Sequence, residues 1–222
     1  MLWKFDGNPK DSQWNYQKWD GTRAGFVATP VFYRSRVYIA TGLDPEQFEG
    51  IGHLYCIDPH GAGDVSPEVE DGRGGGKPNP NSRMVWHYGG PMAGALPGDA
   101  GRQWVFHRTP CTCVIQDDLL YIADVGGYFH CLDCLTGHQY WEQDFSEAVF
   151  GSACWADGKV YQGTCEGNVW IFAHGKVKKE PRKIAMGAPI YASPVFANGV
   201  LFIACKDRLY AIREEKKGDG SR

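Results

Sequence analysis

Cysteines are the residues whose spacing most suggests chemistry. Cys131-Leu132-Asp133-Cys134 has the Cys-x-x-Cys spacing of zinc ligands and directly follows His130, and Cys111-Thr112-Cys113 is a second close pair. Cys56 and Cys131, however, fall at equivalent positions of the repeats described below, where a small buried side chain is expected. We therefore interpret the cysteines as core residues and predict no metal bound to them.

An acidic segment offers a second type of site. Asp44, Glu46 and Glu49 are separated by Pro45, Gln47 and Phe48, and His53 follows. Carboxylates are the ligands that calcium prefers, so we name these three as metal-ligand candidates. Their spacing matches no calcium-binding loop, and we interpret the segment as a solvated surface insertion.

Other carboxylates are predicted near the rims of the sheets. Asp124, Glu166 and Asp207 come just after strands, and Glu142 and Asp144 extend another strand outward. The sequence shows no recognisable Ser/His/Asp arrangement. The glycine-rich residues 72–77 neither follow a strand nor open a helix, so they are not a phosphate loop. No catalytic residues are predicted.

The elements that must position these residues form a repeat. An aromatic anchor recurs at Tyr38, Tyr121, Tyr161 and Phe202, at steps of 83, 40 and 41 residues, and the first step contains an insertion. A period of about 40 residues made of strands and turns is typical of a β-propeller blade. We predict an all-β propeller of about four blades with four antiparallel strands each, at about residues 27–88, 107–144, 150–186 and 191–212.

Strand order within each blade follows from residue types. Innermost strands of small residues are predicted at 28–31, 108–111, 151–154 and 192–195. They lead into two-residue turns, of which Asp157-Gly158 and Asn198-Gly199 have the residues that type I′ requires, while Asp117-Asp118 and Ser35-Arg36 are less suited. Second strands are predicted at 37–40, 120–123, 160–163 and 201–204, third strands at 53–58, 128–133, 168–172 and 208–212, and fourth strands at 84–88, 139–143 and 183–186.

Residues 2–6 look like an orphan outer strand, since Leu2-Trp3-Lys4-Phe5 is similar to Val85-Trp86-His87-Tyr88. Either this strand completes the last blade and closes a ring of four, or it ends a blade truncated upstream, which we favour. Residues 6–26 and the insertion 59–83 are predicted to be long exposed loops because their composition buries little apolar surface. A third loop is predicted at 89–106, and a charged, frayed tail at 214–222.

Composition excludes several partners. The net charge of −3 lacks the basic excess expected of a nucleic-acid-binding protein. The longest apolar run has six residues, Val200 to Cys205, against roughly 20 for a membrane span.

Residues 1–6 do not form a secretory signal, so the protein is cytosolic or Met1 is not the native start. Eight cysteines among 222 residues are too few for a disulfide scaffold.

Residues 131–141 resemble the tryptophan-docking motif of the pyrroloquinoline-quinone-like, or quinoprotein, propellers, which reads A-x-D-x-x-T-G-K-x-x-W. Asp133, Thr136, Gly137 and Trp141 match, Cys131 takes the small-residue position, and His138 replaces the lysine. The resemblance implies that the acid and Thr-Gly form a tight turn and that the indole packs on the next blade. By repeat form it covers about residues 28–212, and it is greatest to uncharacterised repeat proteins of planctomycete-type bacteria.

The resemblance has two functional implications. The family includes quinoprotein alcohol and glucose dehydrogenases, with adjacent cysteines, a base aspartate and calcium near the quinone, and cofactor-free relatives such as the outer-membrane-protein assembly lipoprotein. This sequence has no Cys-Cys pair. We therefore predict a non-catalytic scaffold that binds a protein partner or small ligand through its loops, without cofactor. The alternative is the C-terminal part of a dehydrogenase that uses pyrroloquinoline quinone and calcium.

Two further expectations follow. Family members usually close eight blades, so four would form half a ring, and two copies of the chain could associate to complete one. Relatives are usually exported, which implies a periplasmic or cell-envelope location.

Overall fold

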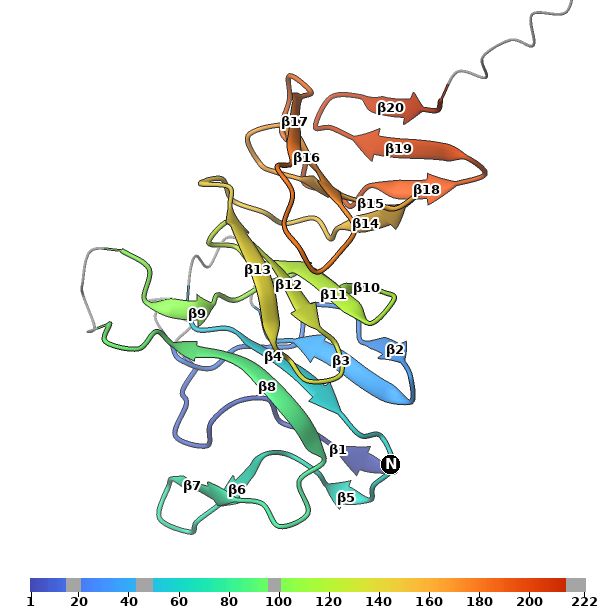
Figure 1. Cartoon of the computed structure of the whole chain (residues 1–222). Coiled ribbons are helices and arrows are strands. Elements are labelled where there is room, and N and C mark those ends of the chain that lie inside the picture. The colour runs from blue at the N-terminus through green and yellow to red at the C-terminus, as the bar shows by residue number, and fades with distance from the viewer. Residues whose placement is uncertain (15–20, 43–49, 96–100, 215–222) are drawn as a thin grey trace, which may run out of the picture.

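The structure is a computed structural model that describes residues 1–14, 21–42, 50–95 and 101–214. These residues form twenty strands and no helix, which confirms the predicted all-β fold class. Four main sheets follow one another along the chain, from the blue N-terminal end to the red C-terminal end in Figure 1. We call these sheets blades one to four.

Each blade is a run of antiparallel strands in chain order. Blade one contains β2 (Val31–Tyr33), β3 (Arg36–Ala40), β4 (His53–Ile57), β8 (Met84–Pro91) and β9 (Trp104–Phe106). Blade two contains β10 (Val114–Gln116), β11 (Leu119–Ala123), β12 (Tyr128–Asp133) and β13 (Gln139–Asp144). Blade three contains β14 (Cys154–Ala156), β15 (Lys159–Gly163), β16 (Asn168–Ala173) and β17 (Arg182–Ala185), and blade four contains β18 (Val195–Ala197), β19 (Val200–Ala204) and β20 (Leu209–Ile212).

The first hairpin of every blade has a two-residue turn with positive φ at both positions. Asp157-Gly158 and Asn198-Gly199 do so as predicted, and Asp117-Asp118 adopts the same geometry. In blade one the turn is Arg34-Ser35, one residue earlier than predicted, because Tyr33 pairs with Arg36. Positive φ at both positions gives the twist that joins two right-handed strands.

The four aromatic anchors occupy the same place in their sheets. Each lies on the second strand, with partners in register on the first and third strands. These cross-strand rows are Val31–Tyr38–Cys56–Trp86, Val114–Tyr121–Cys131–Trp141, Cys154–Tyr161–Ile171–Arg182 and Val195–Phe202–Ala211. The fourth position is filled by tryptophan in blades one and two, by arginine in blade three, and by no described residue in blade four.

Residues 28–30, 108–111, 151–153 and 192–194 of the small-residue segments are not in strands, so the innermost strands begin later than predicted. These segments instead join neighbouring blades through a ladder of side-chain hydroxyls. The Thr29 N–H donates to Thr112 Oγ1 at 3.0 Å, the Thr112 N–H to Ser152 Oγ at 2.8 Å, and the Ser152 N–H to Ser193 Oγ at 2.9 Å. Short side chains are required because each backbone approaches the next blade closely.

The N-terminal strand does not complete blade four. β1 (Trp3–Lys4) pairs in parallel with β5 (Gly63–Asp64) of the insertion, beside blade one, whereas β20 lies at the opposite end of the molecule (Figure 1). The four-blade ring closed by residues 2–6 is therefore wrong for this structure. Among the described residues, the only strand that pairs with β20 is β19.

The described parts of the two segments predicted as long loops are more ordered than their composition suggests. The insertion contains β5 and the hairpin of β6 (Glu68–Glu70) and β7 (Gly76–Pro78). Asn79 holds it together, since its side-chain amide donates to the carbonyls of Asp64 at 3.0 Å and Ser66 at 2.9 Å. In residues 6–26, Asp6 binds Lys10 at 2.9 Å and Arg23 at 2.7 Å. Side-chain hydrogen bonds and ion pairs thus add to the few buried apolar side chains, such as Val65 and Ala24, in ordering these segments.

The predicted loop at 89–106 is partly strand. β8 continues through Pro91, beyond its predicted end at Tyr88, and β9 pairs with it as a fifth strand of blade one. Gly89 and Gly90 both have positive φ, and the register shifts between Gly90 and Pro91. The glycines that suggested a loop instead bend a strand.

Candidate functional site

Blades one and two are joined by an indole. The Trp86 ring is 8% exposed, and its Nε1–H donates to the Cys134 carbonyl at 2.9 Å. Gly137 has a φ of +76°, and a Cβ built there would lie 2.8 Å from the Trp86 ring. Glycine is therefore required both for the backbone conformation and for the close approach of the indole.

The predicted docking-motif residues surround the same turn of blade two. Asp133 Oδ1 accepts from the N–H groups of Leu135 at 2.9 Å and Thr136 at 3.0 Å, and Trp141 Nε1–H donates to the carbonyl of Gly175 in blade three at 3.0 Å. Trp141 thus repeats at the second interface the contact that Trp86 makes at the first.

Blades three and four lack this contact. Arg182 occupies the register position of Trp86 and Trp141, and its side chain is exposed. Blade four has three described strands. Blade three therefore provides a fourth strand without an indole, and blade four provides no described fourth strand, so the space filled between blades one and two stays open here.

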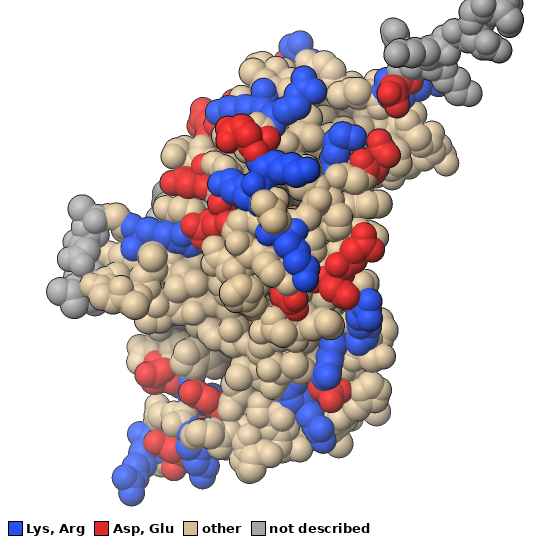
Figure 2. Space-filling model, viewed as in Figure 1, with Lys and Arg blue, Asp and Glu red and all other residues tan. Residues whose placement is uncertain are grey.

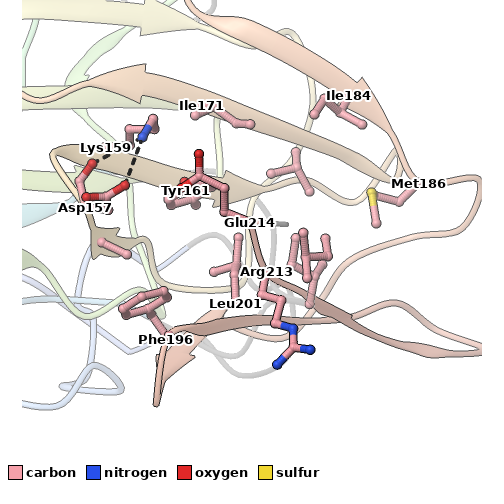
Figure 3. A pocket seen from close by; sticks show the side chains of 15 residues that line it. Asp157, Lys159, Tyr161, Ile171, Ile184, Met186, Phe196, Leu201, Arg213 and Glu214 are labelled. Atoms are coloured by element: carbon pink, nitrogen blue, oxygen red, sulfur yellow. Dashed lines mark hydrogen bonds and ion pairs between the residues drawn. The ribbon is translucent and has the colours of Figure 1, made fainter. Parts of the chain in front are cut away.

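The result is an apolar groove of about 710 Å³ between the facing surfaces of blades three and four. Figure 3 shows side chains from the two sheets pointing toward each other across it. The apolar lining includes Tyr161, Ile171, Ile184, Met186, Phe196, Leu201, Ile203 and Ile212. Charged groups line it as well, with Asp157 and Lys159 paired at 3.4 Å, together with Arg213 and Glu214.

The groove adjoins an edge of β20 that pairs with no strand among the described residues, which we call the free edge. The Cys205 N–H donates to the Arg208 carbonyl at 2.8 Å, so Arg208 faces β19. Because backbone groups alternate in direction along an antiparallel strand, Tyr210 and Ile212 also face β19, while the N–H and C=O groups of Leu209 and Ala211 face the free edge. Leu209 and Ile212 expose 66% and 44% of their surface. This edge can accept another strand.

A second region, buried between blades one and two, is rich in ionisable groups. Asp124 is fully buried, and its Oδ2 lies 3.1 Å from His107 Nδ1 and 3.2 Å from His130 Nε2. His130 Nδ1 lies 3.2 Å from Glu142 Oε2, and Arg102 Nη1 lies 2.6 Å from Glu142 Oε1. The prediction that Asp124 lies at an exposed rim is therefore wrong, because its side chain is buried. Its carboxylate can be buried because His107 and His130 bind it.

Hydrogen bonds within the cluster favour the charged forms of Asp124, Glu142 and His130. Burial by itself would raise the pKa of both carboxyls, but hydrogen bonds from His107 and His130 lower that of Asp124, and those from His130 and Arg102 lower that of Glu142 to about 2. Burial would lower the pKa of His130, yet hydrogen bonding to both carboxylates raises it. The groups neutralise one another, which is a structural arrangement joining two blades.

Sequence reasoning missed His107 and Arg102 as members of this cluster. The available signal was His130, a polar residue between Phe129 and Cys131 on an otherwise apolar strand, since a buried imidazole needs partners. The missed members lie on either side of β9, far from His130 in sequence, with Arg102 in the segment predicted as loop and His107 just after it, and so the spacing could not indicate them.

The cysteines lie apart from any ligand cluster. Cys131 and Cys134 are buried, and burial raises the pKa of the Cys131 thiol to about 12. Within residues 1–14, 21–42, 50–95 and 101–214, no group of three or more His, Cys, Asp or Glu is arranged to hold a metal ion. The calcium-ligand candidates Asp44, Glu46 and Glu49 lie outside the described residues. His53, which follows them, instead faces His87 at 2.9 Å.

Surface features add little to these sites. Acidic and basic side chains are interspersed over the face shown in Figure 2. No helix in the described part of the chain is long and apolar enough to cross a membrane.

Comparison with known proteins identifies the fold. No protein-family model matches the sequence, and no curated protein matches it. Among solved structures, BamB from Moraxella catarrhalis has a TM-score of 0.52 at 11% identity, covering 86% of this chain and 42% of its own. Quinohemoprotein alcohol dehydrogenase from Comamonas testosteroni has a TM-score of 0.53 at 14% identity, covering 91% of this chain and 30% of its own.

Two computationally designed proteins are also similar. Ika8 has a TM-score of 0.53 at 10% identity, and Ika4 a TM-score of 0.54 at 9% identity. The chain spans 48% of Ika8 and 97% of Ika4, and less than half of the two natural proteins. Identities this low show the fold alone: this chain has the β-propeller fold shared by BamB and a quinohemoprotein alcohol dehydrogenase.

Proposed function

We propose that this chain is a non-catalytic β-propeller scaffold that binds a protein partner by adding a strand of the partner to β20. The single observation that supports this is the free edge of blade four. Leu209 and Ala211 direct backbone donors and acceptors away from β19, beside an apolar groove of about 710 Å³.

An added strand can pair with the backbone groups of the free edge and also cover part of the apolar groove. Its backbone pairs with Leu209 and Ala211, which provides affinity, and alternate side chains lie on opposite faces of the sheet. One set faces the groove, toward Ile184 and Met186. The other set includes the residue opposite Ala211, where blades one and two have tryptophan. The preferred partner strand therefore has a tryptophan at this position.

A peptide provides the test. A fluorescein-labelled copy of residues 83–90, the fourth strand of blade one, is titrated with the protein and followed by fluorescence anisotropy. We expect saturable binding that weakens at least tenfold when the tryptophan of the peptide is replaced by alanine. Ala211→Pro in the protein removes an outward N–H while leaving the β19 hydrogen bonds, and should abolish binding.

The matched control is Val177→Pro, which alters an exposed residue in the turn between β16 and β17. It should bind the peptide as the unsubstituted protein does. Equal binding by all three proteins, or no binding by the unsubstituted protein, would contradict the proposal.

The second candidate function is part of a quinone-dependent oxidoreductase, and its support is the fold shared with the quinohemoprotein alcohol dehydrogenase. The described residues do not fit a quinone and calcium site. The buried carboxylate of Asp124 already binds His107 and His130, and the partly buried carboxylate of Glu142 binds His130 and Arg102. The cysteines are dispersed over the four blades.

Calorimetric titration with pyrroloquinoline quinone and calcium separates the two candidates. The scaffold proposal expects no heat beyond dilution and no reduction of an artificial acceptor with alcohols or sugars. Stoichiometric quinone binding with substrate turnover would replace it with the oxidoreductase.

A periplasmic or envelope location belongs to the same proposal, since the sequence resembles exported proteins. Fractionation of cells producing the full gene product should recover it outside the cytoplasm.

A further inference from the structure

We propose that the strand added to β20 comes from a second copy of this chain, so that two copies related by a two-fold axis form one ring of eight blades. This inference rests on the proposed function, because it names the partner for the same edge. Three independent features of the two ends of the molecule support it.

First, the two exposed end faces are the two halves of an interface that the chain already repeats internally. Blade one presents an apolar hollow of about 600 Å³ that includes Phe32, Val37 and Ile39. Val37 and Ile39 are equivalent to Leu120 and Ile122 of blade two, which are completely or almost completely buried in the core cluster that includes Trp86 and Tyr88 of blade one.

The other half is the outer face of blade four. Val195, Phe202 and Ala211 are equivalent to Val31, Tyr38 and Cys56 of blade one, which face blade two. Val195 is 54% exposed and Phe32, at the other end, 68%. Placing blade four of one copy against blade one of another brings together surfaces of the types that pack within the chain.

Second, the hydroxyl ladder ends in a donor and an acceptor. Each N–H in the series Thr29, Thr112, Ser152 donates to the hydroxyl of the next blade. In the described residues the Ser193 N–H has no acceptor and Thr29 Oγ1 accepts no hydrogen bond. A second copy supplies both, since Ser193 of one copy can donate to Thr29 Oγ1 of the other.

Third, β1 is placed to serve as the missing fourth strand of a preceding blade. Trp3 and Phe5 line the hollow on blade one, outside the sheet. One edge of β1 pairs with β5 over two residues, and its other edge has no partner strand among the described residues. Leu2-Trp3-Lys4-Phe5 has the same alternation as the fourth strand around Trp86, with Trp3 at the position opposite Ala211 of the second copy.

A reciprocal arrangement forms each contact twice and leaves neither end free. Two copies are sufficient for such an assembly, because one chain spans 48% of the length of Ika8.

Analytical ultracentrifugation over a hundredfold range of concentration tests the inference. We expect a reversible dimer. Phe32→Asp at one end and Ala211→Pro at the other should each raise the dimer dissociation constant at least tenfold. Val177→Asp, at a residue that is 75% exposed away from both ends, should leave it unchanged. Thr29→Ala should weaken the dimer and Thr29→Ser restore it, because serine provides the hydroxyl at the equivalent positions 152 and 193.

Mixing distinguishes a reciprocal dimer from one formed through a single end. Phe32→Asp retains an intact blade four and Ala211→Pro an intact blade one, so their mixture has one undamaged contact and should associate more tightly than either variant alone. No gain on mixing, or sensitivity to one substitution only, would overturn the two-ended arrangement.

The outcome separates this inference from the function on which it rests. A chain that stays monomeric at all concentrations but binds the peptide of residues 83–90 overturns the second copy and leaves the scaffold proposal standing. A monomer that binds no peptide overturns both. A dimer unaffected by Ala211→Pro and Phe32→Asp also overturns the inference, because association then occurs elsewhere.

Discussion

Blades one and two meet through the indole of Trp86 and a buried chain of charged groups, whereas blades three and four face each other across a groove of about 710 Å³. The strands that carry these surfaces pair in the same register. What differs is the residue opposite the third strand, tryptophan in one case and Arg182 in the other, and the absence of a described fourth strand from blade four. The comparison indicates that the fourth strand and its tryptophan close an interface between blades.

The largest expected effect comes from removing the indole at the closed interface. Trp86→Ala leaves a cavity beside Tyr38 and an unbonded carbonyl at Cys134, and should lower the free energy of unfolding by about 3–5 kcal/mol in chemical denaturation. Val177→Ala, at an exposed site, should change it by less than about 0.5 kcal/mol. A loss of less than about 1 kcal/mol for Trp86→Ala would show that the indole does not close the interface.

The next largest loss of stability is expected from a change in the charged cluster between blades one and two. Glu142→Gln removes the carboxylate between His130 and Arg102 and should destabilise the protein by about 2 kcal/mol at neutral pH, less than for a fully buried pair because the Glu142 side chain remains 25% exposed.

This effect should depend on pH. The pKa of Glu142 in the folded protein is lowered to about 2, and the value in an unfolded chain is about 4.3, so its stabilisation is present above the unfolded value and lost as pH falls from about 4 toward 2. Denaturation at several pH values should show the difference between the two proteins shrinking across that window. A constant difference would contradict the assignment.

Comparing two glycines, one packed against Trp86 and one in open space, tests how much close packing contributes to stability. Gly137→Ala places a methyl group 2.8 Å from the Trp86 ring at a φ of +76°, whereas Gly158→Ala meets no atom within 4 Å at a similar φ of +69°. Both should lose about 1 kcal/mol to backbone strain. Gly137→Ala should lose about 1–2 kcal/mol more, as in other overpacked sites. Equal losses in thermal unfolding would mean that the indole can move away without cost.

The smallest expected change in stability comes from a substitution that makes the interface between blades three and four more like that between blades one and two. Arg182→Trp places an indole at the register position of Trp141 and should raise the free energy of unfolding by about 1 kcal/mol, through packing toward blade four. Arg182→Ala is the control and should change stability little, since the Arg182 side chain is exposed. No gain for tryptophan over alanine would show that the third interface requires the missing strand as well.

The sequence predicted the fold class and the strand rows well, because the features that carry them are local and repeated. The anchors Tyr38, Tyr121, Tyr161 and Phe202 all occupy equivalent places, and Asp157-Gly158 forms the expected turn. These depend on residue type and short spacing. The role of the docking motif in stability stays a prediction, which the tryptophan and glycine substitutions test.

Features that depend on distant partners were not predictable. From the sequence, Asp124 was predicted at a rim, whereas the structure places His107 and His130 beside it. Thr29 was predicted to be in a strand, whereas its N–H donates to Thr112. The insertion at 59–83 was predicted to be a loop, whereas Asn79 orders it by donating to the backbone carbonyls of Asp64 and Ser66. In each case the deciding partner lies in another part of the fold, which composition and spacing do not encode.

Amide hydrogen exchange measured by NMR tests most directly whether β20 accepts a further strand. With Phe32→Asp used to reduce association, we predict rapid exchange at Leu209 and Ala211, which face the free edge, and slower exchange at Tyr210 and Ile212, which face β19. Adding the peptide of residues 83–90 should slow exchange at Leu209 and Ala211 at least tenfold. Unchanged exchange at both amides in the presence of saturating peptide would contradict the account.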